Sequence, residues 1–165
     1  DIPEEEIASA ISETLAPLSR EGGENPAAVV EELREMMQEK VGIIRTGKLL
    51  KEALKDLDEL EARAALTCPG GSRIYNPGWH QALELGAMID VSRMCALAAL
   101  EREESRGGHT RDDFPIPDHS HWGKVNSVIS LSGDGSMKIE HRSYPPIDEE
   151  FKALLDADDL HEEEA

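Results

Sequence analysis

Residues 76–105, NPGWHQALELGAMIDVSRMCALAALEREES, are the stretch that decides the fold. They begin on Asn76-Pro77, an N-cap residue followed by a proline at the first helical position. Apolar residues then recur at helical spacing, and no strong helix breaker interrupts them. We therefore predict one helix, about 42 Å long, that ends where Gly107 or Gly108 adopts a left-handed conformation.

Two stretches upstream have the same amphipathic pattern. The first begins at Asn25-Pro26, and its apolar face extends from Val29 to Ile44. The second covers about residues 48–65, after a break at Thr46-Gly47. None of these helices would be stable alone, and the short loops between them favour antiparallel packing. The chain is therefore predicted to be mainly α, with an antiparallel three-helix bundle.

The sequence changes character after the third helix. Residues 125–142 alternate weakly between polar and apolar around SGDG at 132–135, which predicts a β-hairpin. The chain then ends in an acidic tail, with a short helix expected at about 149–155. We divide the chain into a linker or short helix (1–24), the bundle (25–117), a loop and hairpin (118–147), and the acidic tail (148–165).

Charge and hydropathy exclude several classes of partner. The chain of 165 residues has 35 acidic and 17 basic residues, and its net charge is −18. A nucleic acid or an anionic membrane surface attracts basic surfaces, so neither is expected to bind. No apolar run approaches the roughly 20 residues that span a bilayer, so we expect no direct membrane insertion. We expect no signal peptide. Because the first residue is Asp1 rather than Met, we also expect the chain to be a piece of a longer protein.

The cysteines favour a reducing, cytoplasmic compartment. The two of them, Cys68 and Cys95, are too few for a disulfide framework. Cys95 lies in an apolar helical stretch and is predicted to be a small core residue.

Most of the chemically suggestive side chains lie in residues 103–115, EESRGGHTRDDFP. His109 with a neighbouring aspartate could form an acid–base pair, but no Ser or Cys has the setting of a nucleophile. Arg106 and Arg111 could bind a carboxylate substrate. We favour a structural role, in which these arginines bond the free carbonyls of a helix end and pair with Asp112, Asp113 or a neighbouring domain.

Two kinds of ligand site can be sought in the sequence, a histidine cluster and a glycine-rich loop. His119 and His121, with Asp118 beside them and His109 upstream, could hold zinc or iron. We favour ordinary loop histidines, because the segment has no second ligand pair of defined spacing. The sequence also has neither GxGxxG nor GxxxxGK[ST], so we expect no dinucleotide site in this chain.

A basic island stands out in the acidic chain: Arg45, Lys48, Lys51 and Lys55. It could be a docking face. The alternative, which we favour, is a solvated helix face whose bases pair with nearby acids at helical spacing.

Two segments carry a family resemblance. Residues 76–85, NPGWHQALEL, and residues 98–115, AALEREESRGGHTRDDFP, resemble the C-terminal domain of succinate dehydrogenase and fumarate reductase flavoprotein subunits. The family pattern is E-S-R-G-[AG]-H-x-R-x-D-[FY]-P. The turn VGIIR at 41–45 is also similar, and the resemblance covers about residues 24–145.

The resemblance implies a spectrin-like three-helix bundle followed by a tail that contains strands. The whole flavoprotein interconverts succinate and fumarate through FAD and passes electrons to an iron–sulfur subunit. Such a complex lies at the cytoplasmic face of the inner membrane. The catalytic, FAD-binding and substrate-binding residues of the family lie in earlier domains, so we expect no catalytic, cofactor or metal residue in this chain.

The resemblance also implies a role for one set of residues, which would pack the bundle against the FAD-binding domain: Arg106, Gly107, Gly108, His109, Arg111 and Asp112. If both arginines have their main partners in that missing domain, replacing the pair with Ala should cost this chain less than about 1 kcal/mol.

L-aspartate oxidase and adenylylsulfate reductase share this architecture. The hairpin after Pro117 favours succinate dehydrogenase or fumarate reductase over an aspartate oxidase. The alternatives are the equivalent domain of L-aspartate oxidase and a stand-alone acidic helical module that binds another protein.

Overall fold

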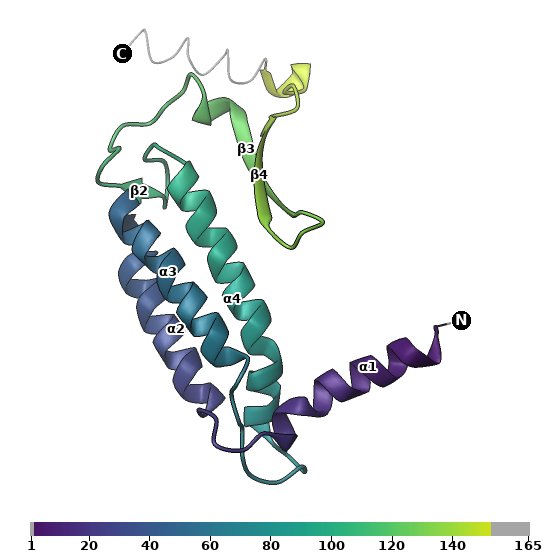
Figure 1. Cartoon of the computed structure of the whole chain (residues 1–165). Helices are drawn as coiled ribbons and strands as arrows, with labels where there is room; N and C mark the ends of the chain where they lie inside the picture. Colours follow the sequence, from purple (N-terminus) through teal and green to yellow (C-terminus); the bar gives the residue numbers. More distant parts are fainter. Residues whose placement is uncertain (1, 153–165) are drawn as a thin grey trace, which may run out of the picture.

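The computed structural model describes residues 2–152. It is mainly helical, with two small sheets (Figure 1). Its elements are α1 (Glu4–Leu15), η1 (Ala16–Ser19), α2 (Pro26–Lys40), β1 (Ile44–Arg45), α3 (Gly47–Ala64), α4 (Pro77–Glu101), β2 (Thr110–Arg111), η2 (Trp122–Lys124), β3 (Val125–Leu131) and β4 (Met137–Ser143). The predicted acidic tail lies outside the described residues from position 153 onward, and residues 149–152 are helical.

The helices α2, α3 and α4 lie side by side, and each contacts the other two (Figure 1). Their ion pairs show that α2 and α3 run in opposite directions. Arg63, near the end of α3, pairs with Glu24, which precedes α2, and with Glu32 in the first half of α2. Lys40, at the end of α2, pairs with Asp56 in the middle of α3. We refer to these three helices as the bundle.

Each helix of the bundle begins on a side chain that accepts a hydrogen bond from its first turn. The three bonds are Ala27 N to Asn25 Oδ1 (2.9 Å), Leu49 N to Thr46 Oγ1 (3.2 Å) and Trp79 N to Asn76 Oδ1 (3.1 Å). The predicted helix starts at Asn25 and Asn76 are confirmed. Thr46 was predicted only as a break, and it is also the N-cap of α3.

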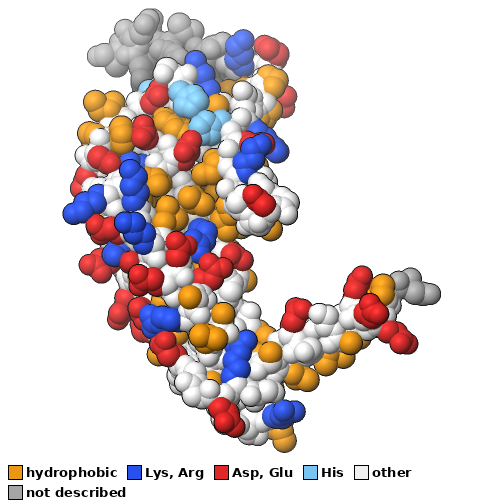
Figure 2. All heavy atoms as spheres, viewed as in Figure 1, with side chains coloured by type: hydrophobic (Ala, Val, Ile, Leu, Met, Phe, Trp, Pro, Cys, Tyr) orange, Lys and Arg blue, Asp and Glu red, His pale blue; other side chains and the backbone are white. Residues whose placement is uncertain are grey.

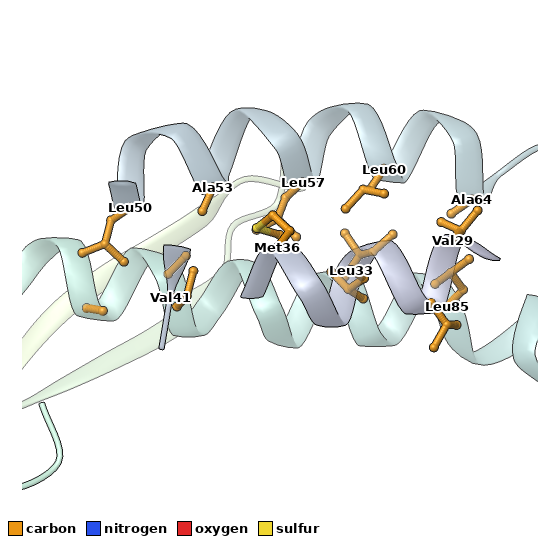
Figure 3. Packing of buried hydrophobic residues seen from close by; sticks show 14 residues of the cluster. Val29, Leu33, Met36, Val41, Leu50, Ala53, Leu57, Leu60, Ala64 and Leu85 are labelled. Atoms are coloured by element: carbon orange, nitrogen blue, oxygen red, sulfur yellow. The ribbon is translucent and has the colours of Figure 1, made fainter. Parts of the chain in front are cut away.

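The core of the bundle is aliphatic and is shared by all three helices (Figure 3). Leu50, Leu57 and Leu60 of α3 are at most 2% exposed. The other core side chains are Val29, Val30, Leu33, Met36, Val41, Ala53, Ala64, Leu85, Ile89, Ala96 and Ala99. Burial of a Leu or Val side chain stabilises the fold by roughly 1.5–3 kcal/mol, so this shared face explains why the helices associate.

The prediction that the third helix continues to Ser105 is wrong. The helix α4 ends at Glu101, and Arg102 has an extended backbone with ψ of 98°. The chain turns there because Glu104 is drawn into a fully buried position between arginines. Gly107 does have a left-handed φ of 57°, but it lies in a separate turn rather than at the end of the helix.

The apolar faces of the first and third helices also extend less far than predicted. Ile44 belongs to β1 instead of the first helix, and it is 64% exposed. Its backbone pairs with the loop after α4, as Ile44 is in parallel register with Thr110. Cys95 is exposed rather than a core residue, because α2 and α3 cover only one side of α4.

The N-terminal segment forms the short helix that was one of its two predicted forms. The helix α1 projects from the base of the bundle, and none of its described residues is buried (Figure 1). Hydrophobic side chains follow one edge of this helix (Figure 2). Its end is tied to α4, because Trp79 Nε1 donates a hydrogen bond to the carbonyl of Thr14 at 2.8 Å.

The predicted β-hairpin is confirmed. Strands β3 and β4 are antiparallel, with a register that runs from Val125 opposite Ser143 to Leu131 opposite Met137. The connecting turn closes through Ser132 N and the carbonyl of Ser136 at 2.8 Å. The hairpin stands beside α4, and β3 contacts that helix (Figure 1).

Among residues 2–152, every helix is too short or too polar to cross a lipid bilayer.

Candidate functional site

The loop after α4 lies across the ends of two helices of the bundle. It returns along β1, where Thr110 N donates to the carbonyl of Ile43 at 3.2 Å and Asp112 N donates to the carbonyl of Arg45 at 3.0 Å. We call residues 102–118 the arginine loop. It contains all six residues that the resemblance assigned to domain packing.

Glu104 is the centre of the arginine loop. Its carboxylate is 0% exposed and accepts hydrogen bonds from Arg102 Nε at 2.8 Å, Arg106 Nε at 3.1 Å and Asp118 N at 2.7 Å. Burial raises the pKa of this carboxyl, but the bonds from Arg106, Asp118 N and Arg102 outweigh burial and lower the pKa to about 2. Glu104 is therefore a buried anion that holds both ends of the loop.

Arg111 closes the C-terminal end of α4. It is 1% exposed, and its Nη1 donates to the carbonyls of Ala99 at 2.9 Å and Leu100 at 3.0 Å. These carbonyls belong to the last turn of α4, where a helix leaves its acceptors free. The guanidinium also lies over the ring of Phe114, with 4.9 Å between Cζ and the ring centroid. The expectation that an arginine of this loop bonds the helix end is confirmed for Arg111.

Asp113 joins the arginine loop to the start of α3. Its carboxylate accepts from Arg111 Nε at 2.8 Å and from Gly47 N at 2.8 Å. The bond from Arg111 lowers the pKa of Asp113, and the bond from Gly47 N lowers it further. A Cβ atom at Gly47 would lie 3.0 Å from Asp113 Oδ2, so the absence of a side chain lets the loop approach the helix. A negative charge is favourable at this helix terminus.

The glycine pair forms the tip of the arginine loop. Arg106 N donates to the carbonyl of His109 at 2.8 Å, and His109 N donates to the carbonyl of Arg106 at 3.0 Å. Gly107 has a positive φ within this turn, whereas Gly108 does not. Both glycines are exposed, and a Cβ atom on either would meet nothing within 4 Å. The tip thus presents bare backbone at the surface.

The structure does not assemble the acid–base pair that was considered for His109. The ring Nε2 lies 3.0 Å from the carbonyl of Arg102. Burial lowers the pKa of His109, and the nearby guanidinium of Arg45 lowers it further. The carboxylate of Asp113 is bonded to Arg111 and Gly47, and the side chain of Asp112 is exposed.

The histidines of the following loop do not form a metal site with His109. Within the described part of the chain, no group of three or more His, Cys, Asp and Glu side chains could hold a metal ion. His121 and His141 instead pack against Trp122, each with 4.8 Å between ring centroids. Trp122 is 7% exposed and lies beneath the guanidinium of Arg102. These aromatic rings fasten the hairpin to the end of α4.

A hollow of about 500 Å³ lies between α4, the tip of the arginine loop and β3. It is lined by Arg45, Cys95, Ala98, Ala99, Arg102, Arg106, His109, Asn126 and Ser127. The basic island is therefore divided: Arg45 lines the hollow, while Lys48 is exposed and lies 3.9 Å from Glu52. The hollow combines side chains from three stretches that are distant in the sequence: residue 45, residues 95–109 and residues 126–127.

Sequence reasoning missed the central role of Glu104 and the place of Arg45 in this hollow. Glu104 follows a run of helical residues and reads as one more exposed acid. A usable signal was its place between Arg102 and Arg106, because an acid flanked by arginines at two-residue spacing can pair with both. The position of Arg45 depends on the pairing of β1 with β2, which local sequence does not reveal.

The fold and the arginine loop define a helical domain whose charged loop is closed by internal ion pairs. The family described as fumarate reductase flavoprotein C-term matches residues 30–153, and the chain belongs to this family.

Individual relatives agree with this assignment. The chain is 41% identical over 106 residues to the fumarate reductase flavoprotein subunit of Helicobacter pylori, a match that covers 64% of this chain and 15% of the relative. It is 34% identical over 134 residues to the succinate dehydrogenase flavoprotein subunit of Coxiella burnetii, which covers 79% of this chain and 21% of the relative.

A solved structure shows the same fold. The Mycobacterium smegmatis Sdh1 complex in the apo form contains a chain that is similar with a TM-score of 0.81 and 37% sequence identity. The match covers 88% of this chain and 25% of that chain. The present chain thus spans about a fifth or less of the length of the two curated relatives and about a quarter of the solved chain.

Proposed function

We propose that this domain serves a longer flavoprotein that interconverts succinate and fumarate through FAD, and that it is inactive alone. The observation that carries the proposal is the match of residues 30–153 to the flavoprotein C-terminal family. The hydrogen bonds within the arginine loop support the proposal that the domain is inactive alone. Its buried charges are engaged with one another and with helix ends, which is the arrangement of a structural element rather than of a reacting site.

We propose that the tip of the arginine loop packs against the FAD-binding part of the same polypeptide. Gly107, Gly108 and Asp112 are exposed in the described structure, and Arg106 and His109 are half-buried. Bare glycine backbone lets another domain approach closely. Arg111 contributes differently, because its partners lie within the chain.

The proposed packing against an FAD-binding part also suggests a role for each segment of the chain. Residues 25–117 would be a spectrin-like antiparallel bundle, and residues 118–147 would be a loop and hairpin fastened to it. Residues 1–24 would connect the bundle to the FAD-binding part, and 148–165 would be an acidic tail. Support comes from the mutual contacts of α2, α3 and α4 and from the pairing of β3 with β4.

We propose the iron–sulfur subunit of the same complex as the second partner, with the assembly on the cytoplasmic face of the inner membrane. The family name and the solved Sdh1 complex support an assembly of this type. The net charge of −18 argues against a direct contact of this domain with anionic lipid.

The parent reading frame and a flavin titration test the proposed function. We expect the reading frame to encode a dinucleotide-binding GxGxxG segment before Asp1. We also expect that only the longer protein binds FAD and oxidises succinate. A start codon at this position would favour a stand-alone module. Stoichiometric FAD binding or succinate oxidation by the 165 residues alone would contradict the proposal.

A further inference from the structure

We propose that the hollow beside the arginine loop receives the carboxylate of an Asp or Glu side chain from the FAD-binding part of the same polypeptide. This inference rests on the proposed function, because it names the partner of a surface that adjoins the domain-packing tip. The hollow is bounded by α4 on one side, β3 on another, and the loop at its end.

The first argument is that buried donors at the hollow have no acceptor. Within residues 2–152, Arg45 Nε and Ser127 Oγ are shielded from solvent and have no hydrogen-bond partner. Buried polar groups are almost always paired, and an unpaired one is destabilising. Both residues line the same hollow. An acceptor group that enters between α4 and β3 would therefore lie beside two residues from separate segments, each of which has a donor without a partner.

The second argument is the balance of charge. Arg102 and Arg106 share the carboxylate of Glu104, so these two cations have one buried anion between them. Arg111 is paired with Asp113. Arg45 has no such partner among the described ion pairs, and burial lowers the pKa of its guanidinium. The hollow is thus electropositive in a chain with a net charge of −18.

The third argument concerns the chemistry of the occupant. The guanidinium of Arg45 is a planar fork whose geometry matches a carboxylate. Apolar Ala98 and Ala99 form part of the wall, so the site suits a carboxylate on a short hydrocarbon stem. A side chain of the same polypeptide is favoured over a free anion because the chain spans only a quarter of its solved relative. The exposed glycine tip next to Arg106 leaves room for a neighbouring backbone.

Cys95 provides the readout, because it lines the hollow and is exposed in the described structure. The experiment uses the full-length flavoprotein with bound FAD and measures the rate at which iodoacetamide alkylates Cys95, followed by peptide mass spectrometry. An occupied hollow should slow alkylation roughly tenfold relative to an unhindered thiol, since a thiol reacts only when accessible. Arg45→Gln should restore the rate, whereas Lys51→Gln, an exposed base of the same island, should not.

A second measurement needs no substitution, so its result does not depend on whether a variant folds. In the unaltered full-length protein, a short reagent that couples a thiol to a carboxyl group should link Cys95 to an Asp or Glu upstream of Asp1. Links confined to these 165 residues would overturn the inference. So would unhindered alkylation of Cys95, or protection that arises only when succinate or phosphate is added, since a free anion would then be the occupant.

These outcomes are separate from those of the proposed function. A protein that binds FAD and oxidises succinate but has an unhindered Cys95 refutes the inference alone. A full-length protein without flavin or activity refutes the proposed function, whatever the reactivity of Cys95.

Discussion

At the scale of single residues, the domain depends on one buried anion. Glu104 is fully buried between Arg102 and Arg106, and it also accepts from the amide of Asp118. A buried ion pair contributes little against a well-packed apolar replacement, but removal of one partner leaves the other buried charge uncompensated. Glu104 should therefore be far more sensitive to substitution than the many acids on the surface.

Glu104→Gln is expected to lower the free energy of unfolding by about 3 kcal/mol, because the two guanidinium groups lose their shared anion. Urea unfolding followed by circular dichroism measures the change. Glu103→Gln is the matched control, since Glu103 is exposed, and it should change stability by less than about 0.5 kcal/mol. Equal effects of the two substitutions would show that the buried site does not carry the stability.

The buried carboxyl of Glu104 also predicts how the stability of the fold changes at acid pH. The pKa of Glu104 is lowered to about 2 in the folded chain, against 4.5 for a glutamate in water. The unfolded chain therefore binds the proton more readily, so the contribution to stability is full above about pH 4.5 and is lost as the pH falls toward 2. The lowered pKa of Asp113 acts in the same direction. Unfolding curves between pH 5 and pH 2 should show this loss, and Glu104→Gln should flatten it.

Arg111 should likewise be costly to remove. Its partners are the carbonyls of Ala99 and Leu100 and the carboxylate of Asp113, so they lie inside the chain rather than in a missing domain. Arg111→Ala is expected to destabilise the chain by about 3 kcal/mol or more, well above the 1 kcal/mol limit for an arginine whose partners are elsewhere. The exposed Arg73 offers a control. A small loss for Arg111→Ala in thermal or urea unfolding would contradict the described bonds.

At the scale of elements, the helix starts and the end of α3 were predictable, whereas the end of α4 was not. Asn25-Pro26 and Asn76-Pro77 are local signals, and both begin helices in the structure. The end of α4 depends on Glu104, which turns inward to reach arginines on either side. That interaction is tertiary, so the local sequence of residues 101–105, which is entirely polar, gave no sign of it.

The same reasoning explains what was predictable in the candidate site. The bonding of an arginine to a helix end follows from composition near a helix terminus, and Arg111 does this. The exposure of Cys95 and the pairing of β1 with β2 could not be foreseen, because they depend on which side of α4 the other elements cover.

The two glycines of the loop tip should respond differently to alanine. Gly107 has a φ of 57°, a conformation in which an L side chain is strained by roughly 1–2 kcal/mol. Gly108 does not have a positive φ, and a Cβ atom there would meet nothing within 4 Å. Gly107→Ala should therefore lower the midpoint of thermal unfolding, and Gly108→Ala should leave it nearly unchanged. Equal shifts of the unfolding midpoint for the two substitutions would contradict a backbone strain specific to position 107.

At the scale of the whole molecule, the described part of the chain is mainly helical and has surfaces that it does not cover itself. The helix α1 carries exposed Ile7, Ile11 and Leu15, and the glycine tip lies bare at the other end. The chain spans only 15–25% of the length of its relatives from Helicobacter pylori, Coxiella burnetii and Mycobacterium smegmatis. A domain that belongs to a longer flavoprotein would be expected to present such surfaces to the rest of the polypeptide.

The most direct measurement of the central claim, that the arginine loop packs domains rather than reacts, is amide hydrogen exchange on the full-length flavoprotein with bound FAD. The amides of Gly107 and Gly108 should exchange slowly, because the FAD-binding part covers the exposed tip. Gly133, in the open turn of the hairpin, is the internal control and should exchange fast. Exchange at Gly107 and Gly108 as fast as at Gly133, in a protein that binds FAD and oxidises succinate, would contradict the account.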